Sequence, residues 1–145
     1  MDLAAATPLS HQTRYRVIYG DTDTMGVVYH ANYLRWFEIG RSELFRAMGL
    51  PYLEIEARGF MLPVSEVTCK YLAPARYDDV VVIDAALNPG FRAGMQFDYV
   101  ISSEDGRVLH ATGQTRHAFV NQDAKVVRPP DFVRDLIRSS ESAKR

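Results

Sequence analysis

The chain has 145 residues, of which 47% are hydrophobic and 24% charged, and its formal net charge at pH 7 is -1. This composition is that of one globular domain and unlike that of a disordered chain. The near-neutral charge excludes a bulk attraction to nucleic acid or membrane, and no apolar run approaches the roughly 18 residues of a membrane span. The single cysteine, Cys69, excludes an intramolecular disulfide and a Cys-rich metal site.

The first predicted element is a strand over 13–19, where apolar and polar residues alternate. The loop GDTDTMG follows it. From about Tyr29 to Met48 the spacing predicts a helix whose apolar residues lie on more than one face, which indicates burial on several sides. Gly49 is expected to cap this helix, and 51–58 are predicted to form a short second helix.

The second half of the chain is predicted to consist mainly of strands. Apolar and β-branched runs place them at 61–71, 80–87, 94–103 and 107–120. Asp105-Gly106 is a signal for a two-residue hairpin loop, and Gly113 predicts a bend or a bulge in the last long strand. Pro129-Pro130-Asp131 is expected to open a final helix.

This order predicts an α+β fold in which an antiparallel sheet covers the long helix, because no other element is large enough to cover it. We expect one domain over 13–138 and loose tails over 1–12 and 139–145. The N-terminal segment is a poor secretory signal, so the cytoplasm is the expected compartment. Part of the sheet lacks a covering layer, which predicts a homo-oligomer, a dimer or a tetramer, with sheets joined edge to edge.

Two carboxylates, Asp21 and Asp23, lie in the loop before the long helix. Turn and N-cap chemistry explains one acid but leaves the second unexplained. A metal site is disfavoured, because the histidines are scattered and the loop lacks the oxygen ligands of a calcium loop. Catalysis is favoured: backbone N–H groups at a helix start can bind a carbonyl oxygen that becomes negative, while an upstream carboxylate attacks the carbonyl or deprotonates water.

The run YGDTDTMGVVYHANYLRWFEIGRSELF, which begins at Tyr19, resembles the signature of the 4-hydroxybenzoyl-CoA thioesterase family of hot-dog-fold proteins. It is most similar to the branch associated with the bacterial Tol–Pal system. The likeness continues in EVTCKYLAPARYDDVVVI and covers about Thr13 to Pro130. The resemblance implies a long helix wrapped by a curved antiparallel sheet, and hydrolysis of acyl-CoA thioesters between two subunits. It implies no cofactor and no metal, with CoA as part of the substrate.

The resemblance also implies roles for particular residues. Asp23 is the catalytic carboxylate, as nucleophile or general base, and the backbone amide at the helix start is that of His30, whose side chain either lines the site or aids proton transfer. Asp21 is expected to stabilise the loop. The expected substrate-binding residues are Gly26, Val28, Tyr29, Asn32 and Tyr33, with Gly59 approaching from the partner subunit. Candidates to bind the CoA phosphates are Lys70, Arg76, Arg92, Lys125 and Arg128.

Two other functions stay open. The first is a hot-dog hydratase or dehydratase, which the thioesterase-type motif disfavours. The second is a non-enzymatic module that binds an acyl thioester or an acyl carrier protein, in which Asp21 and Asp23 are turn residues. The acyl group and its carrier are not specified by the sequence.

Overall fold

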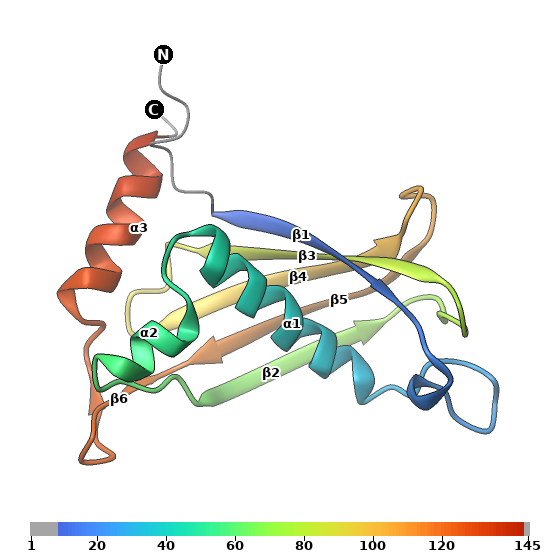
Figure 1. Cartoon of the computed structure of the whole chain (residues 1–145), viewed down its shortest axis with the longest axis horizontal. Helices are drawn as coiled ribbons and strands as arrows, with labels where there is room; N and C mark the ends of the chain where they lie inside the picture. The colour runs from blue at the N-terminus through green and yellow to red at the C-terminus, as the bar shows by residue number, and fades with distance from the viewer. Residues whose placement is uncertain (1–8, 144–145) are drawn as a thin grey trace.

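The computed structural model describes residues 9–143, which form a five-stranded antiparallel sheet crossed by one long helix (Figure 1). The strand order in this sheet is β1-β3-β4-β5-β2. Its strands are β1 (Ser10–Arg16), β2 (Val64–Tyr71), β3 (Val80–Asn88), β4 (Met95–Ser103) and β5 (Leu109–His117). The short strands β6 (Phe119–Val120) and β7 (Val126–Val127) pair with each other. The helices are α1 (Asn32–Ala47), α2 (Tyr52–Ala57) and α3 (Asp131–Ala143).

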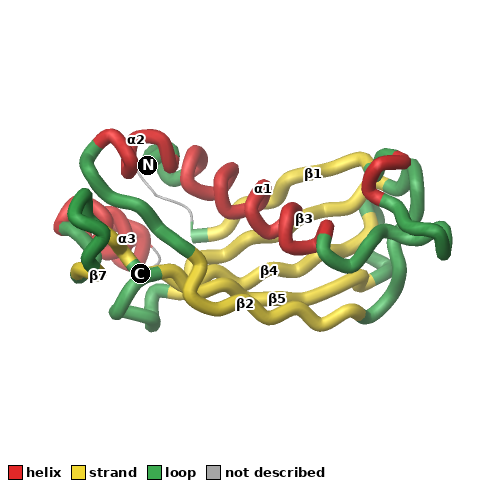
Figure 2. Tube along the Cα trace, turned by 90° about the horizontal axis from the view of Figure 1, so that it is seen from below, coloured by secondary structure: helices red, strands yellow, loops and turns green. Residues whose placement is uncertain are grey.

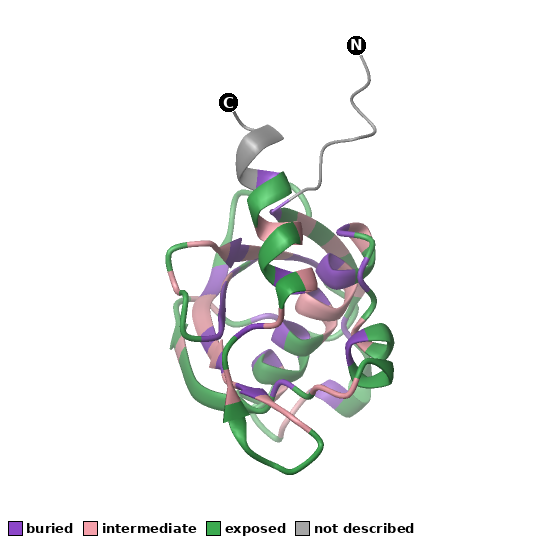
Figure 3. Ribbon diagram, turned by 90° about the vertical axis from the view of Figure 1, so that its left-hand side faces the viewer, coloured by how far each residue is buried: buried purple, intermediate pink, exposed green. Residues whose placement is uncertain are grey.

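These elements confirm the predicted α+β arrangement. Figure 2 shows α1 along one face of the sheet, while the opposite face has no helix on it. The buried residues are concentrated between α1 and the sheet, and α3 is exposed along its outward side (Figure 3). No helix among the described residues is long and apolar enough to cross a membrane.

The ends of the elements differ from the predicted bounds by a few residues. Strand β1 begins at Ser10 and α3 extends to Ala143, so both reach into the segments expected to be tails. The remaining parts of those tails, 1–8 and 144–145, lie outside the described residues. The predicted cap at Gly49 is confirmed: its φ is +81° and its N–H donates to the carbonyl of Arg46.

Helix α1 lies close to the sheet because two glycines leave room for it. A Cβ on Gly40 would lie 2.7 Å from Cγ2 of Ile83 on β3. A Cβ on Gly113 would overlap the ring of Phe37, which is fully buried on α1. Removing side-chain bulk at these two positions therefore allows the aromatic face of α1 to pack directly on the strands.

The prediction of a β-bulge at Gly113 is wrong. Gly113 is in register with Cys69 on β2 and with Tyr99 on β4. The irregularity in this ladder falls instead between Leu109 and Ala111, where the pairing of β5 with β4 shifts by one residue. A glycine stands at this position because the ring of Phe37 packs where a side chain would be. Packing, rather than an unusual backbone conformation, therefore explains Gly113.

The hairpin between β4 and β5 is present, but its loop has four residues, 104–107, rather than two. The N–H of Ser103 donates to the carbonyl of Val108 (2.9 Å), which closes the loop. Inside it, a carboxylate oxygen of Asp105 accepts from the Ser103 hydroxyl (2.7 Å) and from the N–H of Arg107 (3.0 Å). This side-chain bonding stabilises the wider turn.

Gly113→Ala is expected to destabilise the fold by about 1–3 kcal/mol, because the added methyl must displace Phe37 or the β2 backbone. Urea unfolding followed by circular dichroism measures the change. Gly20→Ala is the matched control, since its new Cβ would meet only Cδ1 of Ile18 at 3.7 Å, an ordinary contact. Equal stability of the two variants would contradict the packing explanation.

Candidate active site

The loop between β1 and α1 folds as a small hairpin. The N–H of Asp23 donates to the carbonyl of Val27 (2.9 Å), and the N–H of Tyr29 donates to the carbonyl of Asp21 (2.8 Å). Gly26 has a φ of +78°, and its N–H donates to the carbonyl of Asp23 (3.0 Å). A β-turn followed by one residue in the left-handed backbone conformation is a common three-residue hairpin loop. Glycine adopts this conformation without strain.

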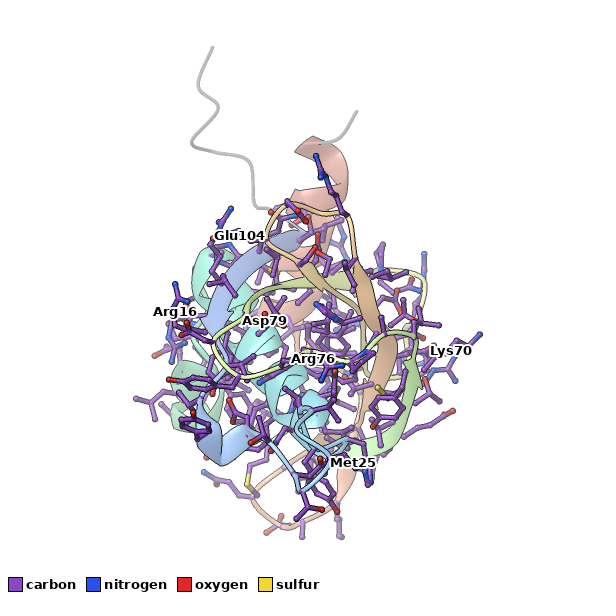
Figure 4. The ribbon with its side chains drawn as sticks, turned by 90° about the vertical axis from the view of Figure 1, so that its right-hand side faces the viewer. Arg16, Met25, Lys70, Arg76, Asp79 and Glu104 are labelled. Carbon is purple, nitrogen blue, oxygen red and sulfur yellow. The ribbon has the colours of Figure 1, made fainter. Side chains whose placement is uncertain are left out.

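One side of this hairpin is anchored in the protein and its tip is free. Val28 is buried, forms a β-bridge with Thr22 and donates its N–H to the carbonyl of Ala75 (2.8 Å). Met25, at the tip, is 78% exposed and is labelled in Figure 4. The hairpin therefore projects from the end of the sheet at which α1 begins (Figure 1).

The buried acid of the loop is Asp21, which is only 4% exposed. Its Oδ2 accepts from the hydroxyl of Tyr15 (2.8 Å) and from the N–H of Ile18 (3.0 Å). Its backbone carbonyl also accepts from Nδ2 of Asn32 (2.7 Å). Three effects raise the pKa of Tyr15: burial is the largest, followed by its hydrogen bond to the Asp21 carboxylate and by the negative charge of that carboxylate. Asp21 thus joins β1, the hairpin and α1, as expected for a loop-stabilising acid.

Only one carboxylate oxygen of the second acid, Asp23, accepts a hydrogen bond. Its Oδ1 accepts from the N–H of Met25 (2.8 Å). Its Oδ2 has no hydrogen-bond partner among residues 9–140, over which side chains are described. Asp23 is half-buried, in contrast to Asp21. The carboxylate is therefore held in position with one oxygen available for chemistry.

Helix α1 begins at Asn32, three residues later than predicted, but a tighter turn leads into it. The N–H of Asn32 donates to the carbonyl of Tyr29 (2.9 Å), and that of Tyr33 to the carbonyl of His30 (3.3 Å). The N–H of His30 itself meets no acceptor in the part of the chain that the structure describes. Such an amide lies at the positive end of the helix dipole.

Aromatic side chains from α1 and β2 support the helix start. The hydroxyl of Tyr71 donates to the carbonyl of His30 (2.8 Å). Tyr33 is buried against Tyr71 and Trp36, with ring centroids 5.2 and 4.7 Å away. Burial, together with the neighbouring Cys69, raises the pKa of Tyr71 to about 12. Its hydroxyl consequently stays protonated at neutral pH and remains a donor to His30.

Gly59 is not brought to this hairpin within one subunit. It follows α2, which lies at the opposite end of α1 (Figure 1). Its N–H donates to the carbonyl of Glu56 (2.9 Å), and a Cβ there would lie 3.1 Å from Nε2 of Gln122. In one subunit Gly59 therefore ends a helix, and its approach from a partner stays a prediction.

Two cavities lie away from the hairpin, and neither is lined by Asp23 or His30. The first, of about 240 Å³, lies beside α1 and has both polar and apolar walls, among them Glu38, Arg41, Ser42, Phe45, Leu62 and Val64. The second, of about 400 Å³, lies between α3 and the turn joining β3 to β4, and its walls include Arg92, Arg128, Arg134 and Arg138. Sequence reasoning named Arg92 and Arg128. It missed Arg134 and Arg138, although their four-residue spacing places both on one face of a helix.

The wall of the smaller cavity includes His117, which the sequence did not single out. It is 2% exposed, with Nδ1 3.0 Å from the carbonyl of Leu62 and Nε2 2.9 Å from the Thr115 hydroxyl. Because a carbonyl only accepts, Nδ1 carries the proton and Nε2 accepts from Thr115. The Thr115 oxygen is then free to accept from the hydroxyl of Tyr99 (2.7 Å). Desolvation lowers the pKa of His117 to about 4, so this histidine is neutral at pH 7.

Among the described residues, no three His, Cys, Asp or Glu side chains are grouped closely enough to hold a metal ion. The polar groups of the hairpin are instead a carboxylate oxygen and a backbone donor. Such a pair suits attack on a carbonyl group.

Comparison with known proteins identifies the family. Residues 17–137 match the Thioesterase-like superfamily. The chain belongs to this superfamily. The membership confirms the hot-dog fold and, at the level of the family, the expected enzyme class of thioester hydrolase.

Three similar proteins illustrate the relationship. The acyl-CoA thioester hydrolase YbgC of Escherichia coli O6:H1 is 33% identical over 95 residues, which is 66% of this chain and 71% of that protein. A hypothetical protein of Aquifex aeolicus, AQ1494, has a crystal structure with a TM-score of 0.81 and 32% identity, covering 88% of this chain and 98% of its own. The DHNA-CoA thioesterase of Staphylococcus aureus has a TM-score of 0.83 and 27% identity, covering 93% and 91%.

Lowering the pH from about 6.5 towards 4 is expected to reduce the free energy of unfolding through His117. Its pKa is about 4 when folded and 6.5 as a free side chain, so the unfolded chain binds the proton more tightly across this window. The contribution is fully present above pH 6.5 and is lost as the pH falls through 4, and it is worth roughly 3 kcal/mol.

Urea unfolding at several pH values, for the wild type and for His117→Gln, isolates this contribution from that of the carboxylates. The difference in stability between the two proteins should shrink as the pH falls. A constant difference from pH 7 to pH 4 would mean that His117 is not held neutral by the fold.

Proposed function

We propose that this chain hydrolyses acyl-CoA thioesters, with Asp23 as the catalytic carboxylate and the amide of His30 as the donor that polarises the thioester carbonyl. The observation that carries the proposal is one short hairpin with a carboxylate oxygen and a helix-start N–H that both lack partners among the described residues. The names of YbgC and of the DHNA-CoA thioesterase support a CoA thioester as substrate.

The proposed chemistry follows from these two groups. The N–H of His30 and the positive end of α1 stabilise the negative charge that develops on the carbonyl oxygen, an effect worth about 3–4 kcal/mol for one such donor. Asp23 either removes a proton from the attacking water or attacks the carbonyl itself to form an anhydride that water then opens. On both routes the carbon–sulfur bond breaks and CoA leaves as the thiolate. One proton of the water stays on the acyl acid and the other neutralises the thiolate, so that Asp23 ends as a carboxylate.

The contacts favour different roles for the other expected site residues. Gly26 shapes the hairpin, Asn32 ties it to α1, and Val28 and Tyr33 are buried, so we assign all of these to positioning. Tyr29 differs, because it is 46% exposed and its ring centroid lies 4.5 Å from that of His30. We propose Tyr29 as the residue that contacts the substrate beside the helix start.

The arginine-lined cavity is our candidate for the CoA phosphates. Arg134 is paired with Asp131, and Arg138 lies 3.6 Å from Asp135. Arg92 and Arg128 have no ion pair among the side chains described over 9–140, so within this range their charges are free for an anion. A guanidinium group matches phosphate oxygens in charge and geometry. The other basic candidates, Lys70, Arg76 and Lys125, do not line this cavity.

We also propose that the chain works as a homo-oligomer in the cytoplasm, without cofactor or metal, and belongs to the Tol–Pal-associated branch of the 4-hydroxybenzoyl-CoA thioesterase family. The hairpin motif supports the branch. The separation of the hairpin from both cavities within one chain supports the oligomer.

Asp23→Asn is expected to lower kcat for acyl-CoA hydrolysis at least about a hundredfold, because the amide keeps the shape but is neither base nor anion. Release of free CoA thiol from a panel of short, long and aromatic acyl-CoAs measures it. Asp123→Asn, in the exposed turn between β6 and β7, is the matched control and should keep the wild-type rate. Unchanged kcat in Asp23→Asn would remove Asp23 from the mechanism.

Arg92→Ala and Arg128→Ala are each expected to raise KM for acyl-CoA about tenfold with little change in kcat, because each loses a charge-assisted contact to phosphate. The same acyl group on N-acetylcysteamine, which has no phosphate, should show no change. Arg107→Ala, in the exposed loop between β4 and β5, is the control. An equal rise in KM for both thioesters would show that these arginines do not bind the CoA phosphates. A higher kcat/KM for acyl groups on acyl carrier protein than on CoA would identify the protein as the carrier.

A further inference from the structure

Three hydrogen-bond donors in the wall of the 240 Å³ cavity have no acceptor among residues 9–140, over which side chains are described. They are the guanidinium of Arg41, the hydroxyl of Ser42 and the hydroxyl of Tyr52. The Tyr52 oxygen accepts from the N–H of Leu62 (3.1 Å), which leaves its own O–H to donate. All three side chains are half-buried, so water reaches them only in part. Donors gathered in this way indicate a ligand that accepts hydrogen bonds.

Arg41 also brings a positive charge to this wall. It takes part in none of the ion pairs formed by the side chains described over 9–140. A half-buried charge is unfavourable unless an opposite charge or hydrogen bonds replace its water. A guanidinium group binds a carboxylate through two parallel hydrogen bonds. A carboxylate is therefore the ligand group that this position fits.

The charge of Arg41 acts on the buried side of the cavity. Burial raises the pKa of Tyr99, and the charge of Arg41 opposes this rise. Burial is the main reason that the pKa of His117 is lowered to about 4, and the charge of Arg41 contributes to the lowering. His117 is neutral at pH 7, and both of its ring nitrogens have partners. Among the residues that line the cavity, Arg41 alone therefore supplies positive charge.

The rest of the wall suits a hydrocarbon chain. Apolar surface next to the three donors comes from Phe45, Leu62, Val64 and Phe97. The volume of about 240 Å³ is below the roughly 300–1,000 Å³ of pockets that bury a drug-sized molecule, so the cavity holds one end of an acyl group rather than a whole thioester. Glu38 also lines the cavity, but it is exposed, so water and salt screen its negative charge.

We propose that this cavity binds a carboxylate at the far end of the acyl group, with Arg41 as the residue that selects it. The preferred substrates are then thioesters of dicarboxylic acids, in which one carboxyl group carries CoA and the other is free. Ser42 and Tyr52 donate to the same carboxylate, and the apolar wall contacts the methylene groups next to it. This inference rests on the proposed function, since it names the acyl group of that reaction.

The acyl group connects the cavity to the hairpin. From His30 to Arg41 the distance along α1 is about 16 Å, at the helical rise per residue. Leu34, Glu38 and Arg41 follow one another at helical spacing, so one side of α1 leads from the hairpin to the cavity. The terminal carboxylate meets the same guanidinium whether the thioester is held by the hairpin of the same subunit or of another.

Substrate selectivity tests the proposal. CoA monothioesters of short, medium and long dicarboxylic acids are compared with monocarboxylic thioesters of the same chain length. At the best length, kcat/KM of the wild type should be at least about tenfold higher for the dicarboxylic substrate, because its free carboxylate gains a charge-assisted contact. Equal values at every length, or a preference for the monocarboxylic substrates, would overturn the proposal.

Variants of α1 assign the selectivity to Arg41. Arg41→Gln should reduce the ratio of the two kcat/KM values to about one, since the amide lacks the charge. Arg41→Lys keeps the charge without the planar fork and should retain part of the preference, while Glu38→Gln should raise it. Arg46→Gln, the same charge change at an exposed position of α1, is the matched control and should keep the wild-type ratio. An unchanged ratio in Arg41→Gln would remove Arg41 from the site.

A binding measurement separates this inference from the proposed function. Monomethyl suberate has an ester at one end and a free carboxylate at the other, and methyl octanoate lacks the carboxylate. In NMR titrations, the half ester should shift the amides of Ser42 and Leu62, with a Kd about tenfold higher in Arg41→Gln than in the wild type. Methyl octanoate should bind equally to both proteins. If the wild type shows this binding but hydrolyses no thioester, the proposed function fails and the carboxylate site stands.

Two results of this measurement would overturn the carboxylate site. The first is the absence of shifts at the cavity, or equal Kd values for the half ester in the two proteins. The second concerns a carboxylate of another copy of the chain as the group that pairs with Arg41. Analytical ultracentrifugation would then show that Arg41→Gln lowers the oligomeric state, while the affinity for the half ester stays unchanged.

Discussion

The buried carboxylate of Asp21 is the interaction on which the candidate site depends. Burying a carboxylate is unfavourable unless charge-assisted hydrogen bonds replace its water. Here the Tyr15 hydroxyl and the Ile18 N–H supply them, and the backbone of Asp21 in turn binds Asn32. The carboxylate thereby fixes the end of β1, the hairpin and the start of α1 relative to one another. Asp23 and His30 owe their common location to this junction rather than to any contact between themselves.

The position of α1 on the sheet has a second consequence. Gly40 and Gly113 let the helix lie directly on the strands, and it covers β1, β3 and β4 more than β5 and β2. The small cavity lies between α1 and the ends of β2, β4 and β5, where Val64, Phe97 and His117 line it. The hydrogen-bonded chain of Tyr99, Thr115 and His117 holds a neutral histidine in the cavity wall, which also carries the charged side chains of Glu38 and Arg41.

Net charge conceals a local cluster of positive charge. The total of -1 gives no indication of a charged partner. The fold nevertheless gathers four arginines around one cavity of about 400 Å³, from the turn between β3 and β4 and from α3 with the segment before it. Acidic residues on α3 pair with two of these arginines and leave the other two available. The local arrangement of charge, rather than its sum, is the reason for proposing that an anion binds there.

The sequence by itself determined the local features of this protein. Helical periodicity predicted α1 and its Gly49 cap. The run that begins at Tyr19 predicted a thioesterase of the hot-dog superfamily and a loop-stabilising role for Asp21, while the catalytic role of Asp23 stays a prediction. These signals are local, because capping, turn chemistry and periodicity act within a few residues. The hairpin loop was predicted two residues too short, since the bonds that Asp105 makes inside it outweighed the propensity of the dipeptide.

Only the tertiary structure decided which distant residues meet. It placed Gly59 at the far end of α1, showed that Gly113 makes room for Phe37, and brought Arg134 and Arg138 to Arg92. It also buried His117 against Leu62, a residue 55 positions away in the chain. Strand register and helix packing set these contacts, and both depend on the whole sheet being assembled. No local pattern in the sequence contains that information.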